Sequence, residues 1–249
     1  MARIELHNVS VEFPIYNLSA RSFKKNFIRL ATGGSVVKND AHQVMIKALN
    51  HLTFSIQHGD RVGLIGHNGA GKSTLLKLLA GIYEPTAGHI STEGKINSLL
   101  NLMIGIESEH TGYENIYLRG TLLGLSRDEI HQQIDEIMAF TGLGDYLHMP
   151  TRTYSKGMLL RLAFAISVNI KPEILLIDEI FGAGDASFIQ QAQDKMVSLL
   201  KESSIVVMAN HSDKLIEDFC NKAILLEGGQ IKYFGNTKDA LLQYHQQKG

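Results

Sequence analysis

The stretch GHNGAGKS, from Gly66 to Ser73, constrains the fold of this 249-residue chain more than any other. It fits the pattern G-x-x-x-x-G-K-[ST], between the short apolar run RVGLIG and the leucine-rich run STLLKLLAG. This order predicts a strand, a glycine loop and a helix that ends near Gly81. Glycines let backbone N–H groups approach a phosphate, and the helix N-terminus adds partial positive charge. The sequence therefore predicts a phosphate-binding loop.

Each residue of this loop has an expected role. We expect Lys72 to reach the β- and γ-phosphates of a nucleotide, Ser73 to ligate Mg²⁺ and Thr74 to bond a nearby phosphate. Backbone N–H groups should cradle the phosphates along the rest of the loop, which comprises His67, Asn68, Gly69, Ala70 and Gly71. The loop therefore predicts a nucleotide and Mg²⁺ as cofactors.

Two further apolar runs end in residues that suit a nucleotide site. ILLIDE, residues 174–179, has four apolar residues, as expected of a strand buried on both faces of a parallel sheet. We expect Asp178 to hold Mg²⁺ through water and Glu179 to act as general base on the attacking water. IVVMANH places His211 after a third strand, where it can sense the γ-phosphate; a surface or capping histidine is the alternative.

Local signals predict several helices and a hairpin. Ser155 should cap a helix that runs to about Asn169 and presents Ser155 and Gly157 to an anion; an ordinary N-cap is the alternative. KAILLEGGQIKYFG predicts a hairpin, and Thr237 is expected to cap the last helix. SRDEIHQQIDEIMAF predicts a helix with a capping box and an apolar core stripe: Ser126 with Glu129, then Ile130, Ile134, Ile137 and Met138.

The order of these motifs resembles that of ABC-type ATPases, the nucleotide-binding subunits of ABC transporters. YSKGM, residues 154–158, lies where that family has its signature, usually Ser-Gly-Gly-Gln; Ser155 and Gly157 match, whereas Lys156 and Met158 depart from it. GAGD, ending at Asp185, lies where the family has its D-loop, which communicates across the dimer; a glycine-rich turn is the alternative.

The resemblance also assigns roles outside these motifs. Phe13 matches the aromatic residue that stacks on adenine, with Tyr16 as a possible substitute and a strand-end core aromatic as the alternative. Most members have a glutamine that contacts Mg²⁺ and water; this chain departs from that pattern, and Glu107, which lies nearest to its place, is the candidate metal ligand.

The fold that the resemblance implies is α/β: a P-loop NTPase core with a mainly parallel sheet, an antiparallel β portion and a helical lobe. We expect a single ABC ATPase domain over residues 1–249, with the core in 1–102 and 166–249 and the lobe at about 103–165. Two ATP molecules should lie in a homodimer, each between the phosphate loop of one subunit and the signature of the other.

A basic insertion, residues 14–47, lengthens the stretch between Phe13 and the phosphate loop. Phe23, Phe27 and Leu30 recur at helical spacing beside basic residues, which predicts a short amphipathic helix for a membrane surface or a partner; an arm packed on its own domain is the alternative. The basic residues, against the single acid Asp40, are Arg21, Lys24, Lys25, Arg29, Lys38 and Lys47.

The insertion, together with TGYENIYLRG, resembles the ATPases of polysaccharide ABC exporters for O-antigen, capsule or teichoic acid. That resemblance implies a lipid-linked glycan as substrate, two copies of a polytopic membrane permease as partners and a peripheral place on the cytoplasmic face of the bacterial inner membrane. Because the chain stops at Gly249, we expect no further carbohydrate-binding domain.

Composition narrows the alternatives. The formal net charge of −1 argues against a nucleic-acid partner by bulk electrostatics, and the single cysteine, Cys220, excludes an internal disulfide. The sequence contains no apolar run of about 18 residues, so it predicts no membrane-spanning helix. Its charged start, MARIELHNVSVEF, is unlike a signal peptide. An importer or small-substrate ATPase, and a soluble ABC ATPase acting on nucleic acid or ribosomes, remain alternatives.

Overall fold

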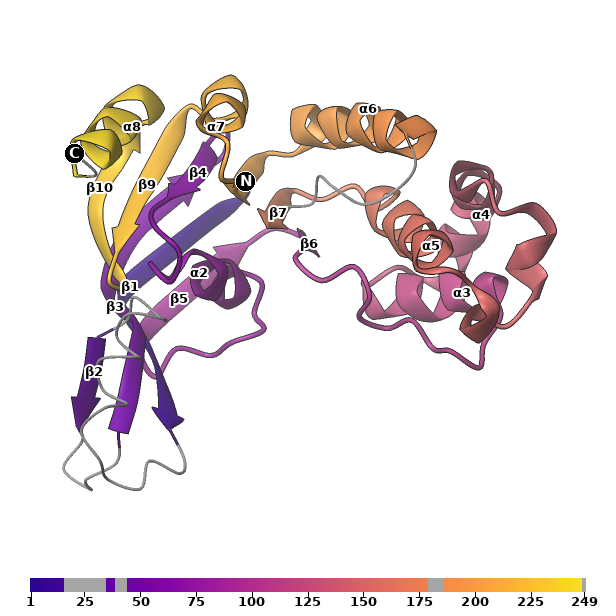
Figure 1. The fold of residues 1–249 in the computed structure, drawn as a ribbon, viewed down its shortest axis with the longest axis horizontal. Coiled ribbons are helices and arrows are strands. Elements are labelled where there is room, and N and C mark those ends of the chain that lie inside the picture. The colour runs from indigo at the N-terminus through magenta and orange to yellow at the C-terminus, as the bar shows by residue number, and fades with distance from the viewer. Residues whose placement is uncertain (16–34, 39–43, 179–185, 248–249) are drawn as a thin grey trace. The chain divides into compact units, whose positions relative to one another are not determined.

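A computed structural model describes residues 1–15, 35–38, 44–178 and 186–247 (Figure 1). The chain divides into two compact units. The first comprises Met1–Ile96, Leu176–Glu179 and Ser204–Gly249, and the second comprises Asn97–Leu175 and Ile180–Ser203. The sequence suggests one ABC ATPase domain with a helical lobe at about residues 103–165, and those bounds stay a prediction.

An antiparallel four-stranded sheet opens the first unit, in the order β2-β3-β1-β5. Its strands are β1 (Arg3–Ile15), β2 (Ser35–Lys38), β3 (Val44–Gln57) and β5 (Ala87–Glu93). The alternation in β1 buries Ile4 and Leu6, while Glu5 between them is partly exposed. The register places Phe13 opposite Ile46, so the antiparallel portion carries Phe13 as predicted.

A second sheet has the order β10-β9-β4-β8-β7-β6. Its strands are β4 (Arg61–Ile65), β6 (Ile96–Leu99), β7 (Ile174–Asp178), β8 (Ile205–Ala209), β9 (Lys222–Glu227) and β10 (Gln230–Asn236). β4 pairs in parallel with both β8 and β9, and β10 closes an antiparallel hairpin at Gly228 and Gly229. The α/β fold with parallel pairing around β4 is thereby confirmed.

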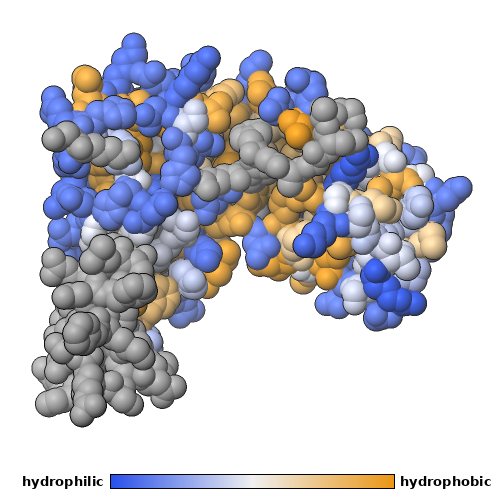
Figure 2. Space-filling model, in the orientation of Figure 1, coloured by the Kyte–Doolittle hydropathy of each residue, from blue (hydrophilic) through white to orange (hydrophobic). Residues whose placement is uncertain are grey.

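In the described part of the first unit the chain forms three helices: α2 (Lys72–Leu79), α7 (Asp213–Phe219) and α8 (Thr237–Gln246). α2 buries its four leucines, as the pattern predicts, and Gly81 follows its C-cap with a φ of 71°. In Figure 2 the surface over α8 and the neighbouring hairpin, at the upper left, is mostly hydrophilic.

The predicted cap of α8 was wrong. Asn236, not Thr237, is the N-cap, and its side chain accepts a hydrogen bond from the Lys238 N–H at 2.9 Å. Thr237 is instead buried, and its hydroxyl donates to the carbonyl of Cys220 at 2.8 Å. The hydroxyl finds a buried acceptor from another element, which leaves the preceding asparagine to cap the helix.

The second unit is helical, with α3 (Gly112–Leu122), α4 (Arg127–Thr141), α5 (Lys156–Val168), α6 (Ala186–Glu202) and the 3₁₀ turns η1 (Gly144–His148) and η2 (Thr151–Thr153). The predicted capping box of Ser126 and Glu129 is present at α4, and a second one, Thr111 with Glu114, begins α3. The predicted stripe packs in the core of this unit: Ile130, Ile134 and Ile137 are buried and Met138 is partly buried against them.

Within the basic insertion the structure describes residues 14–15, 35–38 and 44–47, which belong to β1, β2 and β3. There the chain is extended, and Lys47 of β3 pairs with Glu12 of β1 at 3.1 Å. The amphipathic helix predicted around Phe23, Phe27 and Leu30 lies outside the described residues. Among the residues that are described, no helix combines the length and the apolar character that crossing a membrane requires.

Cys220 gives a test of the packing of the first unit. Its side chain lies beneath β4, close to Gly63, and burial raises the pKa of the thiol to about 12. Because the thiolate is the reactive form, we expect a thiol reagent at pH 8 to label the folded protein about 1,000-fold more slowly than the protein in denaturant. With an aromatic disulfide as the reagent, the absorbance of the aromatic thiolate that the protein thiol displaces measures both rates. Equal rates would show that the packing around Cys220 opens in the native state.

Candidate nucleotide-binding site

The phosphate loop owes its path to glycines that have no room for a side chain. Gly66 has a φ of 148°, and a Cβ there would lie 2.3 Å from the carbonyl oxygen of Leu226. Gly71 has a φ of 111°, and its Cβ would lie 2.9 Å from the carbonyl oxygen of Ala48. Both values are below ordinary contact distance, and both φ angles disfavour other residues, so the glycines are required by the backbone.

Lys72 is held within the loop. Its ammonium donates hydrogen bonds to the carbonyl oxygens of Gly66 at 2.7 Å and of His67 at 3.2 Å. These bonds direct the ammonium back over the loop that precedes α2. Gly71 is the N-cap of α2 and provides no side-chain cap, and the first turn contains no acidic residue. The helix therefore presents a positive N-terminal end beside the lysine, which favours an anion.

A pocket of about 680 Å³ lies within the first unit at this loop. Three kinds of residue line it. The apolar ones are Phe13, Ile46 and Ala48; the loop and helix contribute Asn68, Gly69, Gly71, Lys72, Ser73 and Thr74; and the last group is Asp178 at the end of β7 and His211 after β8. The structure thus gathers the motifs that lie far apart in the sequence around one cavity, with an apolar wall and a polar end.

The apolar wall comes from the paired strands β1 and β3. Phe13 lies opposite Ile46, and its ring meets that of Tyr83 edge to face, with centroids 5.2 Å apart. Phe13 therefore lines the pocket, while its stacking on adenine stays a prediction; Tyr16 lies outside the described residues. The sequence did not indicate Ile46 or Ala48, because their place depends on the register of β3 against β1.

The glycine turn of the β9–β10 hairpin contacts the phosphate loop and holds it by a hydrogen bond. The Gly229 N–H donates to the carbonyl of Ala70 at 3.0 Å, and the Gly229 carbonyl accepts from the Asn50 N–H at 2.8 Å. A Cβ on Gly229 would lie 2.6 Å from the carbonyl oxygen of Ala48. One residue of the β9–β10 hairpin therefore connects the phosphate loop to β3, which carries the apolar wall.

The acidic end of the site is only partly described. β7 is buried over its four apolar residues and ends at the partly exposed Asp178, and His211 follows β8 by two residues. Ser73 and Asp178 both line the pocket, and Mg²⁺ characteristically takes one or two protein oxygens and completes its shell with phosphates and water. These two residues therefore suit Mg²⁺. Glu179 and Asp185 lie outside the described residues.

The serine-capped helix belongs to the second unit. α5 has Ser155 as its N-cap and Asn169 as its C-cap, as predicted, and the Ser155 hydroxyl accepts from the Met158 N–H at 3.2 Å. Gly157 is exposed, and a Cβ there would have only the Ser155 hydroxyl within 4 Å, at 3.8 Å. The first turn has no acidic residue, so this helix end also suits an anion.

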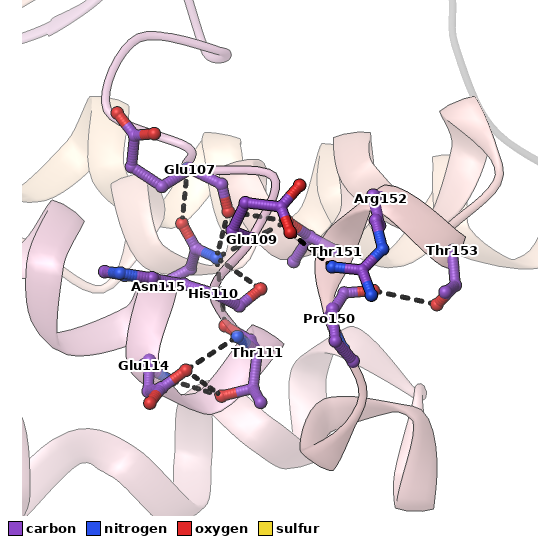
Figure 3. Close-up of polar contacts among 10 residues, drawn as sticks. All are labelled: Glu107, Glu109, His110, Thr111, Glu114, Asn115, Pro150, Thr151, Arg152 and Thr153. Atoms are coloured by element: carbon purple, nitrogen blue, oxygen red, sulfur yellow. Dashed lines mark hydrogen bonds and ion pairs between the residues drawn. The ribbon is translucent and has the colours of Figure 1, made fainter.

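Glu107 also lies in the second unit, in the loop before α3. Its side chain is exposed, whereas its backbone is fixed on both sides by Asn115 (Figure 3). Across the described residues, no cluster of three or more histidine, cysteine, aspartate or glutamate side chains is placed to hold a metal ion. A metal-binding role of Glu107 therefore stays a prediction.

Comparison with known proteins places the chain in a family. The family model described as ABC transporter matches residues 49–182. The chain is 44% identical over 231 residues to the O-antigen export system ATP-binding protein RfbE of Yersinia enterocolitica, covering 93% of this chain and 97% of RfbE. It is 35% identical to the teichoic acids export ATP-binding protein TagH of Bacillus anthracis, covering 97% of this chain but 42% of TagH.

The fold gives the same result. A solved structure titled as the ATP binding subunit of an ABC transporter matches 97% of this chain and 93% of its own, with a TM-score of 0.69 and 24% identity. At that identity the match shows the fold, and the sequence matches show the family. The chain therefore has the ABC ATPase fold and belongs to the ABC transporter family.

Proposed function

We propose that this chain is the ATP-hydrolysing subunit of an ABC transporter that exports a lipid-linked polysaccharide. The observation that carries the enzymatic part is the pocket in which Lys72, Ser73 and Asp178 line one end and Phe13 lines another. The names of RfbE and TagH support a polysaccharide as the exported substrate, in preference to an importer or a nucleic-acid machine.

The residues divide the chemistry as follows. Lys72 and the N-terminus of α2 bind the β- and γ-phosphates, and Phe13 with its apolar neighbours receives the base. Ser73 and Asp178 would hold Mg²⁺, which neutralises charge on the transferred phosphoryl group. Glu179 accepts a proton from the attacking water, and His211 senses the γ-phosphate.

The helix end at Ser155 completes the site from a second copy. Ser155 and Gly157 of one subunit face the triphosphate bound to the phosphate loop of the other, and Asp185 communicates across the dimer. ATP then contributes contacts that exist only in the closed dimer, which is what allows its binding and hydrolysis to drive closing and opening. Two copies of a membrane permease would receive this motion on the cytoplasmic face of the bacterial inner membrane.

The role of Lys72 in phosphate binding is tested by substitution. Replacing Lys72 with alanine removes the charged donor, so we expect the Kd for ATP to rise about 100-fold, as a lost charge-assisted hydrogen bond implies. Calorimetric titration with a non-hydrolysable ATP analogue and Mg²⁺ measures this change. Lys238→Ala is the matched control, because Lys238 is exposed on α8 and does not line the pocket. Equal Kd values for the two variants would show that Lys72 does not contribute to ATP binding.

The general base is tested by Glu179→Gln, with Glu84→Gln, an exposed residue of the first unit, as its control. We expect ATP binding to persist while the turnover number falls at least about 100-fold, since a positioned base contributes at this scale. In the bacterium that carries the gene, the same variant should leave its polysaccharide inside the cell, detectable by surface staining. Near-normal turnover would exclude Glu179 as the base, and normal surface polymer without turnover would exclude the exported substrate.

Shared sites in a homodimer are tested by mixing two inactive variants. Lys72→Ala disables the phosphate loop, and Gly157→Asp places a negative charge at the helix end that should face phosphate. A mixed dimer retains one site with both parts unmodified, so we expect the mixture to hydrolyse ATP faster than the two variants do separately. If the mixture gives only the sum of the separate rates, each site is built from a single copy.

A further inference from the structure

The loop that carries Glu107 is fixed by a buried asparagine of α3. Asn115 is fully buried, its Oδ1 accepts from the Glu107 N–H at 2.7 Å, and its Nδ2 donates to the Glu107 carbonyl at 3.0 Å. The same Nδ2 group lies 2.9 Å from the Thr111 carbonyl and 3.3 Å from the His110 carbonyl. One side chain therefore sets the path of residues 107–111 (Figure 3).

This loop is in turn paired with the segment that leads into α5. The Thr151 hydroxyl donates to the Glu107 carbonyl at 2.8 Å, and the Thr151 N–H donates to the His110 carbonyl at 2.8 Å. The Arg152 N–H donates to the Ser108 carbonyl at 2.9 Å, and the Arg152 side chain forms an ion pair with Glu109. Figure 3 draws the contacts of Thr151 and Arg152 with Glu107, Glu109 and His110, which join the two segments.

The connection from Thr151 to the helix end at Ser155 is short and held by hydrogen bonds. The Tyr154 N–H donates to the Thr151 carbonyl at 3.0 Å, and the Tyr154 hydroxyl donates to the Tyr146 carbonyl at 2.5 Å. Tyr154 is itself buried in the core of the second unit. A change in position at Thr151 therefore has few ways to be absorbed before it reaches Ser155.

Arg119 holds the other end of the loop. It lies one helical turn after Asn115 and donates to the Ile104 carbonyl, while its second guanidinium nitrogen donates to the Ser167 hydroxyl of α5 at 2.8 Å. Arg119 is buried, and burial lowers the pKa of its guanidinium to about 10. Within the described residues no carboxylate pairs with Arg119. Its hydrogen bonds to the Ile104 carbonyl of this loop and to the Ser167 hydroxyl of α5 are therefore what hold the guanidinium in place.

The held loop also displays apolar side chains to solvent. Met103 and Ile104 are 42% and 60% exposed, and Leu122 at the end of α3 is 63% exposed. A Cβ added to Gly105 would lie 2.6 Å from the Leu122 side chain, so Leu122 lies against this loop. The buried side of this loop is held by hydrogen bonds, and its exposed side is apolar. A partner protein that docks on the apolar side could therefore displace the loop, and the hydrogen bonds would transmit that displacement to the neighbouring segment.

We propose that Asn115 is a positioning residue that joins the Glu107 loop to the segment entering α5, so that displacement of the loop is passed to the helix end at Ser155. The inference rests on the proposed function, in which Ser155 completes the ATP site of a second copy. Asn115 itself touches no reacting atom. Its effect on hydrolysis is exerted through residues 151–155.

Hydrogen exchange tests the connection without reference to catalysis. In the full-length Asn115→Ala variant, we expect amide exchange in residues 104–111 and also in 150–158 to accelerate at least about tenfold, because both segments lose the shared anchor. Exchange in α4 should stay unchanged. Thr151→Val is a milder second variant, since it keeps the side-chain shape and removes only the hydroxyl, which donates to the Glu107 carbonyl and accepts a longer bond of 3.5 Å from Asn115 Nδ2. Faster exchange confined to 104–111 in both variants would overturn the proposal.

Steady-state kinetics then separates positioning from general stability. We expect Asn115→Ala to lower kcat about tenfold with KM nearly unchanged, since the pocket in the first unit is intact. Thr141→Val is the matched control: Thr141 is fully buried in the same unit and bonds only within the α4 terminus, to Met138 and Leu143. If the control lowers kcat as much at an equal loss of thermal stability, the proposed role of Asn115 is wrong.

The two measurements also separate this inference from the proposed function. If the wild-type protein hydrolyses no ATP, the proposed function fails, and the exchange experiment alone decides whether Asn115 joins the two segments. If the wild-type protein hydrolyses ATP and the exchange is coupled but kcat is unchanged, the proposed function stands and the transmission to Ser155 is refuted.

Discussion

The close approach of three backbone segments at the phosphate loop is the constraint on which the nucleotide pocket depends. Cβ atoms on Gly66, Gly71 and Gly229 would lie 2.3–2.9 Å from the carbonyl oxygens of Leu226 and Ala48. The loop, β3 and the β9–β10 hairpin can meet only because these three positions lack side chains. Ala48 also lines the apolar side of the pocket, so the wall for the base and the loop for the phosphates are built on one set of contacts. A shift of the hairpin would therefore disturb both ends of the pocket together.

The features that the sequence predicted well are those decided within one or two helical turns. The capping box of Ser126 with Glu129 and the α5 limits at Ser155 and Asn169 need only neighbouring residues. The features that it missed depend on distant partners. Thr237 and Asn236 can each cap a helix, and the choice is made by the carbonyl of Cys220, which accepts the threonine hydroxyl. Ile46 lies opposite Phe13 through a strand register that residues 14–47 obscure in the sequence.

The second unit shows why an apolar stripe alone underestimates a helical core. Asn115, Arg119 and Asn97 are buried, although no periodic pattern marks them. Two of them keep an unsatisfied atom, Nε of Arg119 and Oδ1 of Asn97, within the part of the chain that the structure describes. Burying such groups is unfavourable, as the lowered pKa of Arg119 indicates. What they provide in return is fixed backbone, since Arg119 and Asn115 hold the two ends of the 104–107 stretch.

The nucleotide pocket and the helix end at Ser155 lie in different units of the chain, and this bears on how hydrolysis would be coupled to movement. The described part of the nucleotide pocket lies entirely in the first unit, whereas the helix end at Ser155 and the Glu107 loop lie entirely in the second. A ligand shifts a conformational equilibrium only through contacts that differ between the two states. A triphosphate bound by the first unit alone would make the same contacts in both, and would move nothing. Under the proposed function, the end of α5 from a second copy would supply this difference, because it would engage the phosphates in the closed dimer and release them in the open one.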